Sequence, residues 1–233
     1  LNTDSVYRTA HCYNKVRAFC NDVQAVCDSL VYNTKDSCMT MYRDPIAWSG
    51  DRQLLGEEIQ VFMKDSTIDR AHIINQALTA ELMPDKEHYQ QLSSKEMFAY
   101  FTKGQITQTE AIGNVRSIYY PVDDKDSTLM GLVYIETDTM KMFMRDRQLQ
   151  KIWTSKTDGT WYPMTQIPPE RYKLDGFTWF DYIRPINKDD IYEWRGKKDG
   201  TQLKNITRHA APLQHIEGGE LKSVAATENK PEN

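Results

Sequence analysis

The sequence predicts an all-β protein built from stacked antiparallel hairpins. Apolar side chains recur at every second position in several stretches, and the polar segments between them have the composition of tight turns. Alternate residues of an extended chain share one face, so each stretch predicts a strand with one apolar face. The same short pattern returns along the chain, which indicates a rolled or stacked antiparallel sheet.

The repeat is clearest when four hairpins are aligned on the first apolar residue after the turn. These aligned residues are Met39, Ile68, Ile106 and Leu149. The positions nine, seven and five residues earlier are apolar in every hairpin except at Thr34. They are occupied by Leu30, Ile59, Met97 and Met140, then Tyr32, Val61, Ala99 and Met142, then Met63, Phe101 and Met144. The intervening turns are rich in Asp, Ser and Gly, which stabilise tight turns.

Three regions follow from these patterns. Residues 1–152 hold the hairpin repeats, and within them residues 70–83 fit either a helix or a strand, of which we expect the strand. Residues 153–195 are rich in Trp, Phe and Pro, and we expect them to form an aromatic cap that closes one end of the sheet stack. Residues 196–233 are polar and are expected to form a flexible tail.

Composition and charge exclude several classes of function. The chain has 233 residues, a net charge of -4 and no basic stripe, so a nucleic-acid partner is not expected. No apolar run approaches the ~18 residues that a membrane-spanning helix needs. The polar opening Leu1-Asn2-Thr3-Asp4 shows no targeting signal, which we interpret as a processed or trimmed start.

Motifs for catalysis and for metal binding are absent from the sequence. It contains no His-Glu-x-x-His, no Gly-x-Ser-x-Gly and no glycine-rich phosphate loop. Adjacent carboxylates such as Glu57-Glu58 point to opposite faces of a strand and cannot share a substrate. We therefore expect no enzymatic activity, no cofactor and no metal. The four cysteines Cys12, Cys20, Cys27 and Cys38 are not spaced as zinc ligands, and either free thiols or disulfides fit them.

Residues 39–48 and 54–61 read as an alternating strand, a turn with Pro, a Trp strand and a Leu-polar-Gly step. This order resembles the motif of the OstA/LptA-type family of lipopolysaccharide-transport proteins. Residues 110–116 resemble the family's Ala-x-Gly-Asn-Val strand, and residues 158–177 resemble the C-terminal portion of a longer OstA-like branch. The family's glycine before the valine is missing at Asn14-Lys15-Val16.

The resemblance implies an LptA-like β-jellyroll, also called a β-taco, in which two sheets face each other along an apolar groove. It implies a periplasmic or outer-membrane-associated protein of a Gram-negative-type envelope that carries or bridges lipopolysaccharide through its lipid A chains. The implied partners are an inner-membrane anchor of the same fold, an outer-membrane translocon and further copies joined end to end.

The candidate groove residues are the repeated apolar positions, where flexible methionines suit acyl chains of varying shape. They are Leu30, Tyr32, Met39, Met41, Ile59, Val61, Met63, Met97, Phe101, Ile106, Met140, Met142 and Met144. Rim cations that could meet phosphate are Arg17, Arg43, Lys64, Arg116 and Arg145, although solvated surface charge is the expected role of each. Two other functions stay open: a carbohydrate-binding module that uses Trp161 and Trp179, and a structural or adhesive protein with a dry, filled interior.

Overall fold

The computed structural model describes residues 7–123, 128–146, 148–201, 203, 214–217 and 220–223. Within these residues the chain is almost entirely antiparallel β-structure, which confirms the predicted fold class. The 14-stranded sheet is made of β1 (Thr9–Cys12), β2 (Val16–Phe19), β3 (Gln24–Cys27), β4 (Ser29–Asn33), β5 (Cys38–Tyr42), β6 (Ile46–Ser49), β7 (Arg52–Leu55), β8 (Glu58–Lys64), β9 (Thr67–Leu82), β10 (Tyr89–Thr102), β11 (Gln105–Tyr119), β12 (Gly131–Arg145), β13 (Gln148–Thr154) and β14 (Thr157–Pro163). A separate hairpin pairs β15 (Gln214–Glu217) with β16 (Glu220–Ser223), and the short 3-10 helices are η1 (Met164–Gln166), η2 (Pro169–Arg171), η3 (Asp181–Ile183) and η4 (Asp190–Tyr192).

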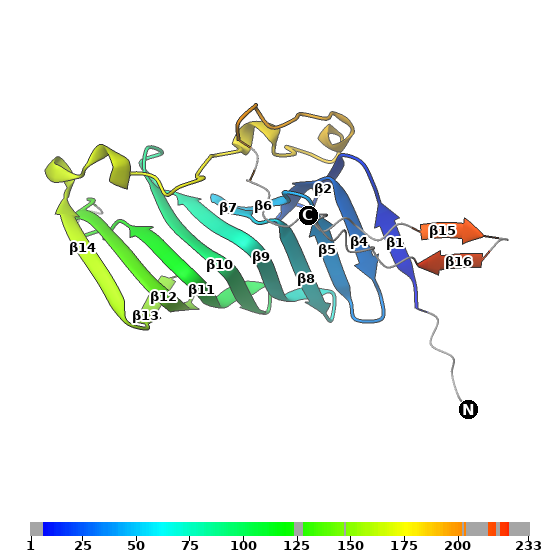
Figure 1. Ribbon diagram of the computed structural model, residues 1–233, viewed down its shortest axis with the longest axis horizontal. Coiled ribbons are helices and arrows are strands. Elements are labelled where there is room, and N and C mark those ends of the chain that lie inside the picture. The colour runs from blue at the N-terminus through cyan, green and yellow to red at the C-terminus, as the bar shows by residue number, and fades with distance from the viewer. Residues whose placement is uncertain are drawn as a thin grey trace, which may run out of the picture.

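The large sheet is folded along its middle into two halves (Figure 1). One part of β9 pairs with β8 and its other part pairs with β7, and β12 divides in the same way between β13 and β14. The first half therefore contains β1, β4, β5, β8 and β13 with the adjoining parts of β9–β12. The second half contains β2, β3, β6, β7 and β14 with the remaining parts of β9–β12. We call the line of bends between the two halves the seam.

Backbone geometry at the seam explains the bends. Asn75 and Gln76 of β9 have φ of +55° and +47°, and Gly113 and Asn114 of β11 have +80° and +49°. β10 and β11 also shift register where they cross the seam. Such bulges and left-handed residues bend a strand sharply. The corner between β7 and β8 needs Gly56 for a different reason, since a Cβ there would lie 2.4 Å from a side-chain methyl of β9.

Glu57 fastens this corner to the bend in β9. Its Oε1 accepts a hydrogen bond from Gln76 Nε2 at 2.5 Å, and its Oε2 accepts one from Asn75 Nδ2 at 3.4 Å. The Glu57 N–H lies 3.2 Å from the carbonyl oxygen of Ile74 and 3.1 Å from that of Asn75. The buried carboxylate therefore accepts a hydrogen bond from each of two neighbouring side-chain amides of the bent strand.

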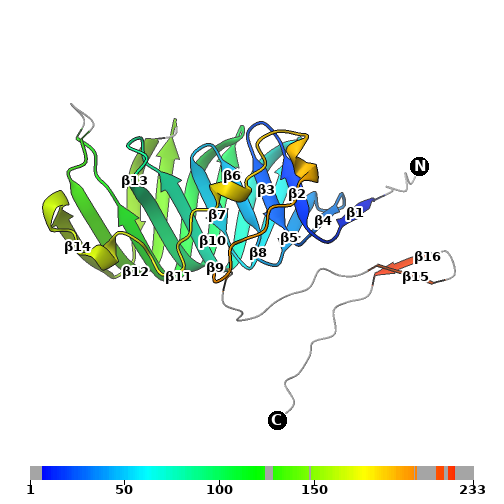
Figure 2. The same cartoon turned by 90° about the horizontal axis from the view of Figure 1, so that it is seen from above.

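The segment expected to cap one end takes another course. Residues 153–163 complete β13 and form β14, and residues 164–196, which we call the strap, run back along the sheet from β14 toward β2 (Figures 1 and 2, yellow to orange). The strap covers the outer face of the second half. Phe180 and Ile183 pack in a cluster with Trp48, and Ile167 and Leu174 pack in another.

Three glutamines on that outer face bind the strap. Gln53 donates from Nε2 to the Thr178 carbonyl at 2.8 Å and accepts the Phe180 N–H at 2.7 Å. Gln91 binds the Tyr172 carbonyl and the Leu174 N–H in the same way, at 2.8 and 2.9 Å. Gln24 accepts two hydrogen bonds from the Arg184 guanidinium, at 2.9 and 2.6 Å. A side-chain amide offers one donor group and one acceptor, so it pairs backbone that has no neighbouring strand.

A buried charge cluster holds the far end of the strap against β2. Asp190 lies between Arg17 and Arg195, and its Oδ2 is 3.3 Å from Arg17 Nη2. The Ile186 N–H, together with the two guanidinium groups, holds the pKa of the Asp190 carboxyl below its usual value. The Arg17 side chain is only 1% exposed. Its expected role as a solvated rim cation is therefore wrong, because the strap covers it.

The polar tail falls only partly within the described residues. Residues 196–201 and 203 and the hairpin of β15 and β16 belong to it, and the rest of the predicted tail lies outside the described residues. Among the described residues, no helix combines the length and the apolar character that crossing a membrane would require.

Replacing Gln53 with alanine tests the role of the strap contacts. Gln53 is fully buried, and its loss leaves the Phe180 N–H, the Thr178 carbonyl and the Trp48 indole N–H, at 3.3 Å, without this partner. We expect the free energy of unfolding in urea to fall by about 2–4 kcal/mol. The control is Gln60→Ala on the uncovered face of β8, expected to cost about 0.5 kcal/mol. Equal losses in the two variants would contradict the assigned role.

Candidate functional site

The predicted groove residues form one apolar cluster between the two halves. Every candidate except Met144 belongs to it, either as a buried member or as a partly buried neighbour. The hairpin repeat explains why, since residues paired directly across strands share a face. One continuous row crosses the first half next to the seam: Cys12, Leu30, Met41, Ile59, Ile73, Met97, Ala111, Met140 and Thr154. We call this cluster the interior.

Exposure of the interior side chains increases with distance from the seam. Along β8, Ile59 is 0% exposed and Val61 is 8% exposed, while Met63 is partly exposed. The same order holds along β10 and β12, where the residue nearest the seam is buried and the residue nearest the hairpin turn is partly exposed. The interior is thus closed at the seam and becomes accessible toward the hairpin turns.

The turn-side boundary of the interior consists of apolar pairs and exposed cations. Met63 pairs with Ile68, and Phe101 pairs with Ile106, each beside a hairpin turn. We call the turns of the first half the rim. Each turn carries an exposed cation, and these are Lys35, Lys64, Lys103 and Arg145. Lys64 and Arg145 are among the predicted rim cations, whereas Lys35 and Lys103 are not, although their place in the repeated turns is a usable signal.

The wall that the second half presents to the interior is made largely of small residues. A continuous cross-strand row runs through Ala18, Ala25, Ala47, Leu54, Thr79, Leu92, Ser117, Ile135 and Gly159. The strap lies on the opposite face of this half, and Ala18, Ala47 and Leu54 remain partly exposed. Long side chains from the first half therefore face short ones from the second. The hairpin repeat does not predict this wall, because the repeat consists mainly of large apolar residues.

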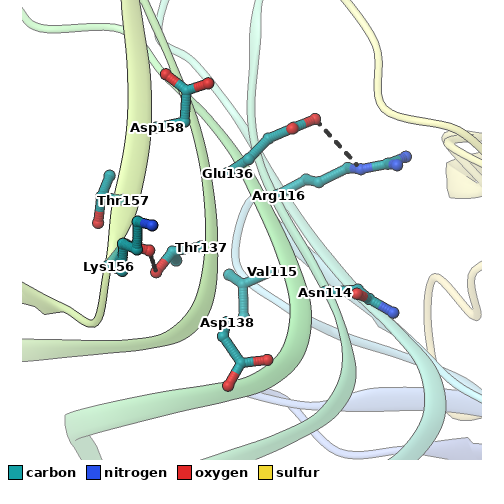
Figure 3. Close-up of a pocket in the computed structure, with 9 residues that line it drawn as sticks. All are labelled: Asn114, Val115, Arg116, Glu136, Thr137, Asp138, Lys156, Thr157 and Asp158. Atoms are coloured by element: carbon teal, nitrogen blue, oxygen red, sulfur yellow. Dashed lines mark hydrogen bonds and ion pairs between the residues drawn. The ribbon is translucent and has the colours of Figure 1, made fainter.

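A polar hollow of about 390 Å³ lies where β11, β12 and β14 meet the seam (Figure 3). Its lining includes Arg116, Glu136, Asp138, Lys156 and Asp158. The Arg116 Nε lies 3.5 Å from a Glu136 oxygen, and its Nη1 lies 2.9 Å from Asp175 Oδ2 in the strap. Charges of both signs line this hollow, so it does not suit an acyl chain.

A second hollow, of about 440 Å³, lies between the strap and the turn that follows β2. It is lined by Phe19, Asn21, Gln24, Asp181, Arg184, Pro185 and Ile186. Neither hollow is lined by a predicted groove residue. Among the described residues no group of His, Cys, Asp and Glu side chains is arranged to hold a metal ion.

The fold and the site together define a folded antiparallel sheet with an apolar interior that opens toward a cationic rim. A scan against models of known protein families finds no match, and a search of curated proteins finds no significant relative.

Alanine substitutions along β8 test the closure of the interior. Ile59→Ala removes a fully buried side chain at the seam and is expected to lower the free energy of unfolding by about 2–5 kcal/mol. Met63→Ala, four residues further along the same face, is expected to lower it by at most about 1.5 kcal/mol. Urea unfolding measures both. A cost for Met63→Ala as large as that for Ile59→Ala would mean that the interior is equally closed at the rim.

Proposed function

We propose that the protein binds the acyl chains of a lipid in its interior, and that it carries or bridges lipopolysaccharide across a Gram-negative-type periplasm for outer-membrane assembly. The observation that carries this proposal is the rise in exposure of interior side chains from the seam to the rim along each strand. The OstA/LptA-type motifs of the sequence supply the identity of the lipid and of the compartment. On this proposal the chain is a binding protein without catalytic activity.

Burial of acyl chains supplies enough free energy without any specific polar contact. Each buried methylene contributes about 0.8 kcal/mol, so six of them contribute about 5 kcal/mol. Met39, Met63 and Met142 are partly exposed members of the interior. Their flexible thioether side chains can repack around chains of different shape. These methionines are therefore the first contacts of a chain that enters from the rim.

Cations of the rim suit the anionic groups of such a lipid. Lys35, Lys64, Lys103 and Arg145 repeat at the turns beside the apolar pairs. A lipid with phosphorylated sugars would place its acyl chains in the interior and its phosphates near these side chains. Ammonium and guanidinium groups form charge-assisted hydrogen bonds with phosphate. The order of apolar pair and cation along each hairpin matches the order of acyl chain and headgroup in the ligand.

Partner proteins of the same fold would dock at the ends of the sheet. β13 and β14 pair only with β12 among the described strands, so each leaves an unpaired edge. Ile152, Trp153 and Trp161 of these strands are exposed. Unpaired edges recruit further strands unless they are blocked, and the strap does not pair with β13 or β14. The end is therefore the proposed contact for a second copy, for an inner-membrane anchor or for an outer-membrane translocon.

The two alternative functions have less support. A carbohydrate-binding platform needs Trp161 and Trp179 exposed together, but Trp179 packs beside the strap's apolar cluster, with its ring 5.2 Å from that of Tyr89. A structural protein with a filled interior agrees with the closed seam but does not account for the partly exposed side chains near the rim. The binding experiment separates these functions.

Lipopolysaccharide binding should depend on the interior face of β8. We expect the wild-type chain to bind purified lipopolysaccharide at micromolar concentration in native mass spectrometry and in displacement of a fluorescent fatty acid. Met63→Asp places a carboxylate among the acyl chains and should weaken binding at least about tenfold. The control is Phe62→Asp, because the neighbouring residue of β8 faces outward. No binding by the wild type, or equal loss in both variants, would refute the proposal.

The rim cations should act on the headgroup alone. Replacing Lys35, Lys64 and Lys103 together with glutamine should weaken lipopolysaccharide binding several-fold and reduce its salt dependence. Binding of an uncharged fatty-acid ester should not change, since that ligand has no anion to contact. A matched loss for both ligands would show that the substitutions disturb the interior instead.

A further inference from the structure

Two cysteines face the interior from opposite halves of the sheet at the same end of the seam. Cys12 lies opposite Leu30 in the pair of β1 and β4, and Cys27 lies opposite Val16 in the pair of β2 and β3. Leu30 and Cys27 are buried members of the interior, and Val16 packs against it. Because directly opposed residues of an antiparallel pair share a face, the Cys12 side chain also points to the interior side.

The two cysteines flank one shared corner of the chain. The segment from Cys12 to Val16 bends through Asn14 and Lys15, which have φ of +64° and +65°. The segment from Cys27 to Leu30 bends beside it, since the two segments pair at both ends. Burial, with smaller contributions from Asp28 and then from Cys12, raises the pKa of Cys27 to about 12. The electrostatic influence of Cys12 on Cys27 agrees with their closeness across the corner.

The other two cysteines lie elsewhere. Cys20 lies in the exposed turn after β2, where its N–H donates to the Val23 carbonyl at 2.8 Å. Cys38 begins β5 opposite Phe62, and its Sγ lies 3.7 Å from Thr40 Oγ1. Phe62 and Thr40 alternate with interior residues along their strands, so Cys38 is on the outer face of the first half. Of the four cysteines, only Cys12 and Cys27 lie directly opposite residues of the interior, which are Leu30 and Val16.

We propose that Cys12 and Cys27 are a disulfide site that joins edge strand β1 of the first half to β3 of the second half. A disulfide oxidant of the glutathione type supplies the two electron-accepting sulfurs. The Cys12 thiolate attacks this disulfide and releases one thiolate, which leaves a mixed disulfide on Cys12. Cys27 then loses its proton to solvent and attacks the Cys12 sulfur, which releases the second thiolate. Two protein thiols are oxidised while one disulfide of the oxidant is reduced.

Accessibility sets the order of these two steps. Cys12 is exposed and meets the oxidant directly, whereas Cys27 is buried. Since the pKa of Cys27 is about 12, its reactive thiolate becomes about tenfold more abundant for each unit of pH at neutral and mildly alkaline pH. The closing step should therefore accelerate by about tenfold per unit between pH 7 and pH 9.

The bond would close the end of the sheet where β1 lies. β1 is a terminal strand whose residues are mostly exposed, and β4 is its one partner among the described strands. A link between residues 12 and 27 constrains the unfolded chain and ties this strand to the opposite half. The inference needs no lipid ligand, so it stands or fails separately from the proposed function.

Peptide mapping of the full chain tests the pairing. Trypsin, which cleaves after Lys and Arg, places Cys12 in residues 9–15, Cys20 and Cys27 together in residues 18–35, and Cys38 in residues 36–43. In the Cys20→Ser variant, Cys27 is the only cysteine left in the peptide of residues 18–35, so a link to that peptide identifies Cys27. After incubation with oxidised glutathione at pH 8, we expect its free thiols to fall from three to one, with residues 9–15 linked to residues 18–35. The melting temperature should rise on oxidation and should return to its original value when dithiothreitol is added.

Control variants make the result decisive. Cys38→Ser should behave as the wild type, whereas Cys12→Ser should form no internal link and show no rise in melting temperature on oxidation. Replacement of the buried Cys27 could disturb folding, so the conclusion depends on the mapping in Cys20→Ser. A mixed glutathione disulfide at Cys12 that never closes, or a link from Cys12 to Cys38, would overturn the proposal.

Discussion

The bends of the long strands at the seam are the constraint on which the rest of this structure depends. A single flat antiparallel sheet commonly leaves at least one face in contact with solvent. Folding the sheet on itself brings the repeated apolar faces of both halves together. The bend places residues such as Asn75, Gln76 and Gly113 in left-handed backbone, and Glu57 accepts hydrogen bonds from the two side-chain amides there.

The two halves differ in how their outer faces meet solvent. No described segment covers the outer face of the first half, where Lys141 pairs with Glu110 and Arg70 lies over the Phe62 ring. The second half has apolar side chains on both faces, and the strap covers the outer one. With that face closed, the exposed apolar surface of the interior lies near the rim. The proposed lipid site and the proposed disulfide occupy this same interior at different places.

Much of the fold could be predicted from the sequence, and the reason is local. The hairpin repeat sets strand phase and turn position together, so the rows of paired residues in the first half follow from it directly. The same phase placed all groove candidates except Met144 in one cluster. Positions such as Arg17 and Gln53 could not be assigned, because their burial depends on a strap that is far away in sequence. The sequence predicts an end cap over residues 153–195, because its proline and tryptophan content indicates irregular chain but not which surface that chain covers.

By itself the sequence determined the class of fold, the alternation of inward and outward side chains, and the apolar positions of the first half. These depend on a period of two and on turn chemistry, which are properties of neighbouring residues. Only the tertiary structure decided where the long strands bend, which face the strap covers, and that Cys12 and Cys27 face one interior. These features arise from pairing between distant segments, and their stability depends on contacts that no short stretch of sequence contains.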